Sequence, residues 1–471
     1  MVSHENDAYR IEQDFLGEKP IPIDAYYGIH TLRAVENFSI SNRRVNLHLI
    51  GAIVTVKKAA AISHQKLGNL SSPIATAIVK ACDEILNGSY SEEFIVDAYQ
   101  GGAGTSTHMN VNEVITNRAL EILGYNKGDY HQLHPLHHVN LSQSTNDVYP
   151  TALRIAAISL LRPLSEAFAE LQDSLQIKEN EYQHAIKLGR TQLMDALPMM
   201  VGQGFGAYAQ AIARDRWRLY KVEERLRQIN IGGTAIGTGM NASLKYIFTI
   251  TDTLQDITSL GLARSEFPMD ITQNMDVFVE VSGLLKSAAT NLFKISSDLR
   301  LLNSGPKGGL GEITLPPVQV GSSIMSGKVN PVMSEMVSQM AMKIMANDQA
   351  ITLAAMNGQL ELNAFTPLIA EALLESLEMM TKAILLFKEK CLEDIIINED
   401  ICKKNLSASC AIATALLHHI GHHHASELVK KAQQEKKDIA TVLRESHILP
   451  EDAVKRILDP YEITKPGIPG I

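Results

Sequence analysis

Four short segments rich in Gly, Ser, Thr and Asn could bind a small anion, because each leads directly into a stretch with helical periodicity. They are GGAGTSTHMN (101–110), SQSTNDVYP (142–150), GRTQLMDALP (189–198) and GSSIMSGKVNP (321–331). A helix N-terminus exposes unpaired N–H groups and carries a partial positive charge, so hydroxyl-rich segments there suit carboxylates or phosphates. Helix capping alone would explain any one segment. All four, with Lys328 as a fixed cation and Arg190 nearby, favour an anion site.

The chemistry that such donors suit is proton removal beside a carboxylate. Neither GxxxxGK[ST] nor GxGxxG occurs, which argues against a nucleotide as the anion. Removing a proton from the carbon next to a carboxylate puts a second negative charge on that carboxylate, and only preorganised donors stabilise it. Losing one such donor costs on the order of 100-fold in rate. Residue types alone do not identify the base, since a serine is a poor base unless its alkoxide is strongly stabilised.

Composition and charge exclude several classes of protein. The 471 residues carry a formal charge of −9 with no long Lys/Arg tract, so we expect no nucleic-acid partner. The N-terminus, MVSHENDAYRIEQDF, has no apolar stretch of signal-peptide length, and no later segment offers about 18 uninterrupted apolar residues. We therefore expect a cytoplasmic protein without a membrane partner. The four cysteines lack CxxC spacing and are predicted to be reduced packing residues.

Helical periodicity dominates the middle of the chain. Apolar residues recur at three- and four-residue steps from Pro150 to about residue 175, from Pro198 to about Ile229, from Met275 to Leu302, and from Pro331 onward. Asn330 and Pro331 suit the N-cap and first position of the last helix. Strand patterns are scarce and no βαβ rhythm appears. The prediction is a mainly all-α fold with an N-terminal domain (1–145), a long central helical bundle (146–395) and a small C-terminal helical domain (396–471).

Two groups of histidines are candidate metal ligands. His134, His137 and His138 lie in a predicted loop. A second group could place imidazoles one helical turn apart: His418, His419, His422, His423 and His424. Without acidic or cysteine partners at matching spacing, we predict no metal site and interpret the second group as a solvated polar face.

Taken together, the motifs resemble the aspartase/fumarase superfamily. The resemblance rests on GTSTHMNVNEV, HVNLSQSTND, GRTQLMDA, GGTAIGTGMN and GSSIMSGKVNP, in this order, and extends from AYYGIHTLRAVENF to DPYEITKPGI. It implies a helical-bundle homotetramer whose active sites combine loops of three subunits, a small dicarboxylate as substrate and no organic cofactor. The sequence does not predict whether a divalent metal activates the protein. Similarity to the aspartase branch implies reversible anti-elimination of ammonia from L-aspartate to give fumarate.

The resemblance also implies roles for individual residues. Ser322 would be the base that removes the Cβ proton. The carboxylate that becomes a dianion would be held by Thr105, Ser144, Thr145 and Ser323. The other carboxylate would be bound by Lys328 and Asn330, and the amino group would lie near Asn146, Thr191 and Gln192. Fumarases and several relatives place a histidine where Gln192 stands, and an amide cannot titrate, so Gln192 favours aspartase.

Several positions depart from the family pattern. Ser326 and Ser334 replace prolines, His108 replaces an asparagine, Met356 replaces a glutamate, and Leu417 and His418 replace an Asn-Pro pair. Losing a proline in the 321–331 loop should cost about 0.4–1 kcal/mol when the loop orders. These departures raise two alternatives, a lyase for another substituted succinate and a weakly active dicarboxylate-binding paralogue; a fumarate hydratase is a third alternative within the superfamily.

Overall fold

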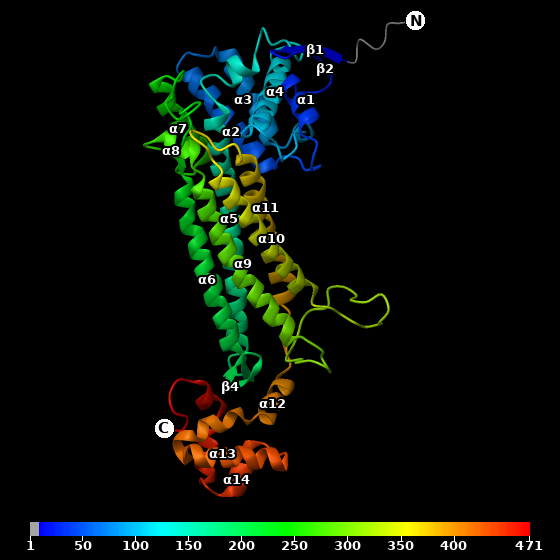
Figure 1. Cartoon of the computed structure of the whole chain (residues 1–471), viewed down its shortest axis with the longest axis vertical. Helices are drawn as coiled ribbons and strands as arrows, with labels where there is room; N and C mark the ends of the chain where they lie inside the picture. The colour runs from blue at the N-terminus through cyan, green and yellow to red at the C-terminus, as the bar shows by residue number, and fades with distance from the viewer. Residues whose placement is uncertain (1–8) are drawn as a thin grey trace. The chain divides into compact units, whose positions relative to one another are not determined.

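The computed structural model describes residues 9–471 and is mainly helical, which confirms the predicted fold class (Figure 1). The first helices are α1 (Ile29–Asn37), α2 (Leu47–Lys66), α3 (Ser72–Leu86) and α4 (Thr105–Ile122). The five longest described helices are α5 (Thr145–Glu181), α6 (Val201–Leu226), α9 (Asp276–Leu302), α10 (Val332–Met356) and α11 (Thr366–Phe387). The shorter ones are α7 (Leu244–Thr258), α8 (Pro268–Gln273), α12 (Glu399–Ala408), α13 (Leu417–Glu435), α14 (Ile439–Ser446), α15 (Glu451–Ile457) and α16 (Pro460–Thr464).

Strands in the described residues form only two-stranded pairs. Three pairs are antiparallel: β1 (Tyr9–Asp14) with β2 (Gly17–Pro22), β3 (Ile186–Thr191) with β4 (Met194–Met200), and β7 (Ile313–Thr314) with β8 (Ile396–Ile397). The parallel pair, β5 (Gln228–Ile229) with β6 (Ala263–Arg264), is two residues long. Short strands of this kind fix local turns, so helix packing supplies the core.

The chain forms two compact units, and each of the five long helices contributes to both. Unit 1 comprises the described part of Met1–Ser165 with Trp217–Ser287 and Met342–Thr381. Unit 2 comprises Glu166–Arg216, Ala288–Ala341 and Lys382–Ile471. The division expected from the sequence, at residues 145 and 395, therefore stays a prediction. No helix of the described residues is long and apolar enough to cross a membrane.

Unit 1 is held together by apolar helix faces with a few buried polar contacts. On α9 the Ser282 hydroxyl donates to Asp348 on α10 at 2.8 Å. The amide of Asn347, also on α10, donates to the Ser376 hydroxyl on α11 at 3.0 Å. Each pair satisfies polar groups that burial would otherwise leave without a partner. These contacts fix which face each helix turns toward the shared core.

Unit 2 combines the remaining halves of the long helices with the C-terminal helices. The hydroxyl oxygens of Ser296 on α9 and Ser338 on α10 lie 3.1 Å apart, within hydrogen-bond distance. The C-terminal helices enclose a core of their own, centred on Leu416, Val442, Leu443 and Val454, each fully buried. The third polar segment, expected to lead directly into a helix, lies instead in the β3–β4 hairpin of residues 186–200, and α6 begins after it at Val201. Gln192 and Leu193 both have positive φ, 54° and 64°, as the tight turn of a twisted hairpin requires.

Candidate active site

The first group of predicted site residues lies in unit 1, where α4 and α5 both begin. Thr105 and Thr145 are the first residues of these two helices. Gly104, just before α4, has φ of +91°, and a Cβ there would approach the Tyr149 ring on α5 to 2.2 Å. The two helix starts are therefore in direct contact. Adjacent helix N-termini direct unpaired N–H groups and partial positive charge at the same region, which favours an anion.

Ser144 and Asn146 belong to the same group and are held by a buried carboxylate. Asp147 accepts from the Ser144 N–H at 2.9 Å through one oxygen and from the N–H groups of Gly232 and Thr234, each at 3.0 Å, through the other. The Asn146 amide donates to the Ala235 carbonyl at 2.7 Å. Burial raises the pKa of Asp147 to about 7, although its three backbone hydrogen bonds oppose the shift. Asp147 thus ties the second polar segment to the GGTAIGTGMN segment.

The second group is at the tip of the β3–β4 hairpin in unit 2. Thr191 ends β3, Gln192 begins the turn, and both are exposed. Arg190, expected to lie near an anion, donates to the buried carboxylate of Glu312 at 2.7 Å. The ion pair engages Nη2 of its guanidinium, and the expectation that Arg190 lies near a bound anion stays a prediction. Arg190 anchors the hairpin and leaves its polar tip exposed.

The third group is the loop of residues 321–331, also in unit 2, which is closed at its base. The Gly321 N–H donates to the Lys328 carbonyl at 2.8 Å, and the Asn330 amide donates to the Gly321 carbonyl at 2.7 Å. A Cβ at Gly321 would meet the backbone of Lys328 and Asn330 at 2.8 Å, so glycine is required. The N-cap prediction is wrong in detail: α10 begins at Val332, and the Asn330 side chain closes the loop instead.

Ser322 occupies a position that suits a base. Its Oγ accepts hydrogen bonds from the N–H groups of Ile324 at 3.1 Å and Met325 at 2.8 Å. Two backbone donors aimed at one hydroxyl oxygen stabilise negative charge on it, as in an oxyanion hole. Ser323 follows, and Lys328 is exposed on the same loop. The stabilised alkoxide that a serine base requires therefore has its donors within the loop itself.

Comparison with known proteins shows the family. Residues 17–346 match the model of a lyase family, and residues 412–465 match that of the fumarase C C-terminus. The chain is 46% identical to an aspartate ammonia-lyase of Bacillus subtilis (strain 168), over 98% of this chain and 97% of the relative. This chain belongs to the aspartase/fumarase superfamily of lyases. It is also 42% identical to an aspartate ammonia-lyase of Escherichia coli (strain K12), over 97% of this chain and 96% of that one.

Solved structures of this superfamily share the fold. A fumarate lyase:delta crystallin from Brucella melitensis, bound to cobalt, has a TM-score of 0.94 and 45% identity, covering 97% of this chain and 100% of that one. A recombinant class II fumarase from Schistosoma mansoni has a TM-score of 0.92 and 34% identity, covering 97% and 99%. The resemblance expected from the sequence motifs is confirmed. The family match and the relatives indicate that this member of the superfamily is a carbon–nitrogen lyase.

The histidine groups of this lyase differ in their surroundings. His134 and His138 stabilise the helical turn at Pro135–Val139. The His138 ring accepts a hydrogen bond from the His134 N–H at 2.8 Å, and the His134 ring accepts one from the Leu136 N–H at 3.0 Å. In the second group Gly421 interrupts α13 with φ of 76°, so the imidazoles before and after it do not share one helix face. The predicted solvated face thus covers only part of the group.

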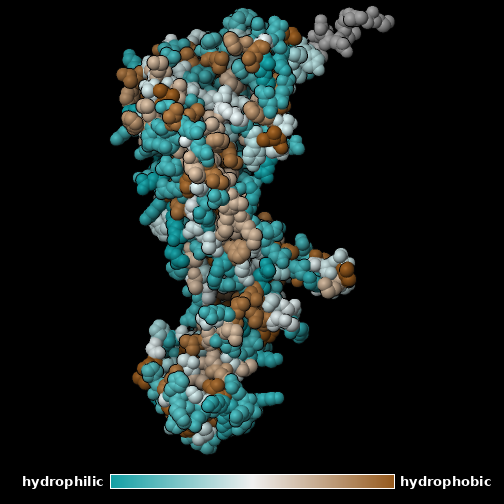
Figure 2. Space-filling view, viewed as in Figure 1, coloured by the Kyte–Doolittle hydropathy of each residue, from teal (hydrophilic) through white to brown (hydrophobic). Residues whose placement is uncertain are grey.

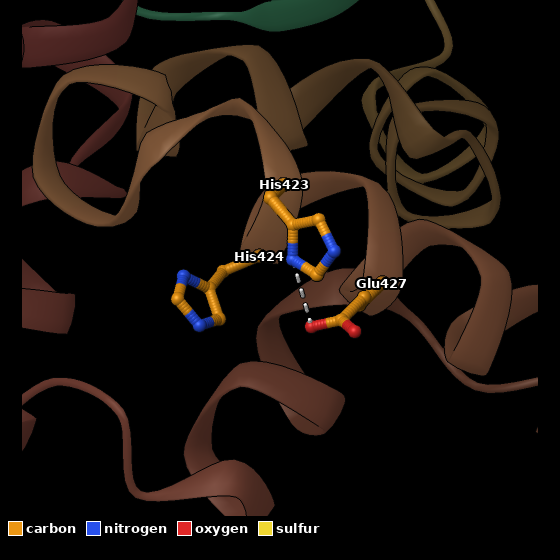
Figure 3. Close-up of side chains that lie close together, drawn as sticks. All are labelled: His423, His424 and Glu427. Carbon is orange, nitrogen blue, oxygen red and sulfur yellow. Dashed lines mark ion pairs between the residues drawn. The ribbon is translucent and has the colours of Figure 1, made fainter.

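An acidic partner that the sequence reasoning missed lies one turn after His423. Ligand atoms of His423, His424 and Glu427 all lie within 4.8 Å of one another, and His423 Nδ1 is 3.5 Å from the Glu427 carboxylate (Figure 3). The i, i+4 spacing of His423 and Glu427 was the available signal. All three side chains are exposed, so water competes with their ligand atoms for coordination of a metal ion. These residues could hold a divalent transition metal, and the absence of a physiological metal site stays a prediction.

Sequence reasoning also missed the buried polar residues behind the helix starts. Lys57, fully buried on α2, and His108 on α4 contact each other behind Thr145. The signal was a lysine within the apolar run AIVTVKKAAA, since a lysine is almost never fully buried unless it has partners. A separate cavity of about 320 Å³ in unit 2 is lined by α6 and α9 side chains such as Phe205 and Leu299. Arg190 lines it, but none of the residues predicted to act as the base or to bind the substrate does.

Proposed function

We propose that this chain catalyses the reversible elimination of ammonia from L-aspartate to give fumarate. The observation that carries the proposal is the Ser322 hydroxyl, which accepts two backbone N–H groups in a loop that also presents Lys328. Near-full-length relatives named aspartate ammonia-lyase support the same reaction. A dicarboxylate substrate agrees with the paired helix starts, where carboxylates are favoured.

In the proposed reaction Ser322, as the alkoxide, removes the proton from Cβ of aspartate. The electron pair moves into the adjacent carboxylate, which gains a second negative charge. This dianion is where donors have the largest effect on rate, because its charge develops as the transition state forms. Its donors are proposed to be Thr105, Ser144, Thr145 and Ser323. Collapse of the dianion forms the carbon–carbon double bond and expels the protonated amino group (–NH3⁺) from Cα as neutral ammonia, while the Cβ proton stays on the Ser322 hydroxyl.

The remaining residues position the other end of the substrate. Lys328 and Asn330 are proposed to bind the second carboxylate, which keeps its charge throughout the reaction. Asn146, Thr191 and Gln192 are proposed to lie near the amino group, where the neutral Gln192 amide can donate and accept hydrogen bonds without titrating. The reaction as written consumes no organic cofactor, and activation by a divalent metal is left open.

A homotetramer is proposed to bring the three groups of residues together. The groups lie at the start of α5, at the tip of a hairpin and in the 321–331 loop, and the family resemblance implies that one active site takes them from three subunits. Large apolar side chains are exposed on long helices of unit 1, including Trp217 (61%) on α6 and Met356 (71%) on α10. Figure 2 shows hydrophobic residues on the surface of the helices. Exposed apolar surface of this kind is typical of subunit interfaces. The cytoplasmic location stays a prediction.

The test is turnover with a matched pair of serine variants. Purified protein with L-aspartate should generate fumarate absorbance and ammonia in equal amounts. Ser322→Ala should abolish both, whereas Ser326→Ala, at the exposed part of the same loop, should retain them. Equal loss of activity in both variants would show that the substitutions act by disturbing the conformation of the loop. Full activity of Ser322→Ala would refute the role of Ser322 as the base.

Fumarate hydration is the second candidate, since one structural neighbour is a class II fumarase. Gln192 disfavours it, because an amide cannot take part in acid–base work with water. Consumption of malate in place of aspartate would support the hydratase. Stabilisation by succinate or fumarate against heat, without turnover of either substrate, would support a dicarboxylate-binding protein with no lyase activity.

A further inference from the structure

Lys57 is surrounded by hydrogen-bond acceptors in the interior of unit 1. Its side chain on α2 is fully buried, and Nζ lies 2.8 Å from Asn140 Oδ1, 2.9 Å from Gln143 Oε1 and 2.5 Å from His108 Nε2. An ammonium group has three N–H donors and no lone pair. The Asn140 and Gln143 oxygens accept two of these N–H groups, and His108 Nε2 lies where it can accept the third, as a buried cation requires.

The orientation of the two amides is fixed by bonds that do not involve Lys57. The Asn140 amide nitrogen donates to the Gln143 carbonyl at 3.3 Å. The Gln143 amide nitrogen donates to the carbonyls of Val139 at 3.1 Å and Leu141 at 3.2 Å. Since both nitrogens face carbonyls, both oxygens must face Lys57. Lys57 is therefore the donor to each amide.

His108 connects Lys57 to a predicted substrate-binding residue. The ring is 1% exposed, with Nε2 facing Lys57 and Nδ1 2.7 Å from the Thr145 hydroxyl oxygen. A neutral imidazole has one N–H donor and one acceptor nitrogen. If Nε2 accepts from Lys57, the ring proton must be on Nδ1, and Thr145 Oγ1 must accept it.

Burial and charge keep His108 neutral. Burial, followed by the positive charge of Lys57, lowers the pKa of His108 well below its ordinary value. Burial also lowers the pKa of Lys57, and the negative charge that opposes this shift is the carboxylate of Asp147. Asp147 lies two residues after Thr145, in the same first turn of α5. The negative charge that favours the Lys57 ammonium is thus part of the same helix start.

We infer that Lys57 and His108 are positioning residues that set the direction of the Thr145 hydroxyl proton. Because Thr145 Oγ1 accepts from His108, its own proton is free to be donated to an anion at the joined starts of α4 and α5. The inference rests on the proposed function in one respect, that Thr145 donates to the substrate carboxylate. A hydroxyl already committed as an acceptor costs little to reorganise when the charge on that carboxylate doubles.

The kinetic test replaces His108 with side chains that keep or remove the two roles of its ring. Asparagine offers one acceptor oxygen and one donor nitrogen, whereas leucine offers neither. His108→Leu should lower kcat for L-aspartate on the order of 10- to 100-fold, the effect of one hydrogen bond to a charged group. KM should change little, because the interaction strengthens in the transition state. His108→Asn should restore most of kcat.

A double-mutant cycle separates positioning from general packing. In the Thr145→Val background, which has no hydroxyl to orient, His108→Leu should lower kcat by less than about 2-fold. An equal loss of kcat in both backgrounds would overturn the inference, because His108 would then act independently of Thr145. Thermal stability is measured for each variant, so that a folding defect is not taken for a kinetic effect.

Neutron diffraction of the perdeuterated full-length protein tests the direction of the bonds without any turnover. We expect three deuterons on Lys57 Nζ, one on His108 Nδ1 and none on His108 Nε2. Deuterium on Nε2 would overturn the inference, since Thr145 would then donate to the ring. If the wild type does not convert aspartate, the proposed function fails, and the positions of these deuterons still decide the inference.

Discussion

Glu312 offers a test of how the β3–β4 hairpin is held. Its carboxylate is buried, with Arg190 Nη2 2.7 Å from one oxygen and Asn405 Nδ2 3.1 Å from the same oxygen. Lys187 Nζ lies 2.8 Å from the other oxygen, as an ion pair rather than a directed hydrogen bond. Burial alone would raise the pKa of Glu312, but Arg190 and Lys187 outweigh it and lower the pKa. The carboxylate is therefore charged at neutral pH.

Glu312→Gln removes this charge while keeping the shape of the side chain. Two cations then face a neutral amide whose nitrogen donates and cannot accept from them. Breaking a buried ion pair by removing one partner costs about 3–5 kcal/mol. We expect about 3 kcal/mol, the lower end, because the side chains of Lys187 and Arg190 keep 13% and 15% exposure and water can reach them.

The assay is urea unfolding at one protein concentration, with Glu399→Gln as the matched control. Glu399 pairs with Lys403 at 3.1 Å on the surface of α12, where the two side chains are 48% and 57% exposed. An exposed pair at this spacing contributes about 0.5 kcal/mol or less. Equal loss of unfolding free energy in both variants would refute the reasoning, since burial would then not determine the strength of the Glu312 contacts. A higher KM in Glu312→Gln alone is expected if Thr191 and Gln192 touch substrate.

Three further predictions follow from single contacts. Gly104→Ala should cost about 1–3 kcal/mol more than Gly102→Ala in urea unfolding, because both glycines have positive φ but only the first added Cβ meets the Tyr149 ring at 2.2 Å; equal costs would argue against this contact. The pKa of His108 is well below 6.5 in the folded chain, so the stability this neutral ring contributes is complete above pH 6.5 and lost as pH falls. Below that pH the free energy of unfolding of His108→Asn should therefore rise relative to that of the wild type, by up to about 1.4 kcal/mol per pH unit. Urea titrations between about pH 7 and 5 measure this difference in unfolding free energy, and a difference that does not change with pH would contradict a neutral ring. Asn330→Ala should lower kcat/KM for L-aspartate at least about 10-fold, because the amide both closes its loop and is proposed to bind a carboxylate; a melting temperature equal to the wild type's is the control, and unchanged kinetics would exclude both roles.

The sequence by itself determined the helical class of the fold, the approximate extent of the long helices and the polar segments that begin α4, α5 and α10. These features follow from periodicity and from the unpaired N–H groups at helix starts, which are properties of neighbouring residues. The residue types also indicated anion chemistry, and Gln192 favoured the aspartase branch of the family. The 189–198 segment carries little alternation of polar and apolar residues, so its strands and the turn at Gln192 and Leu193 are evident only in the folded hairpin.

Only the tertiary structure decided which polar groups act together. Arg190, expected to lie near an anion, pairs with Glu312, 122 residues away. Lys57 and His108, 51 residues apart, meet because α2 and α4 pack their faces against each other. Periodicity indicates that a polar side chain is buried. It does not show which hydrogen-bond or charged partner offsets the free energy that burying this side chain costs. The same limit applies to Ser322, whose two N–H donors come from the fold of a loop that no helical or strand pattern describes.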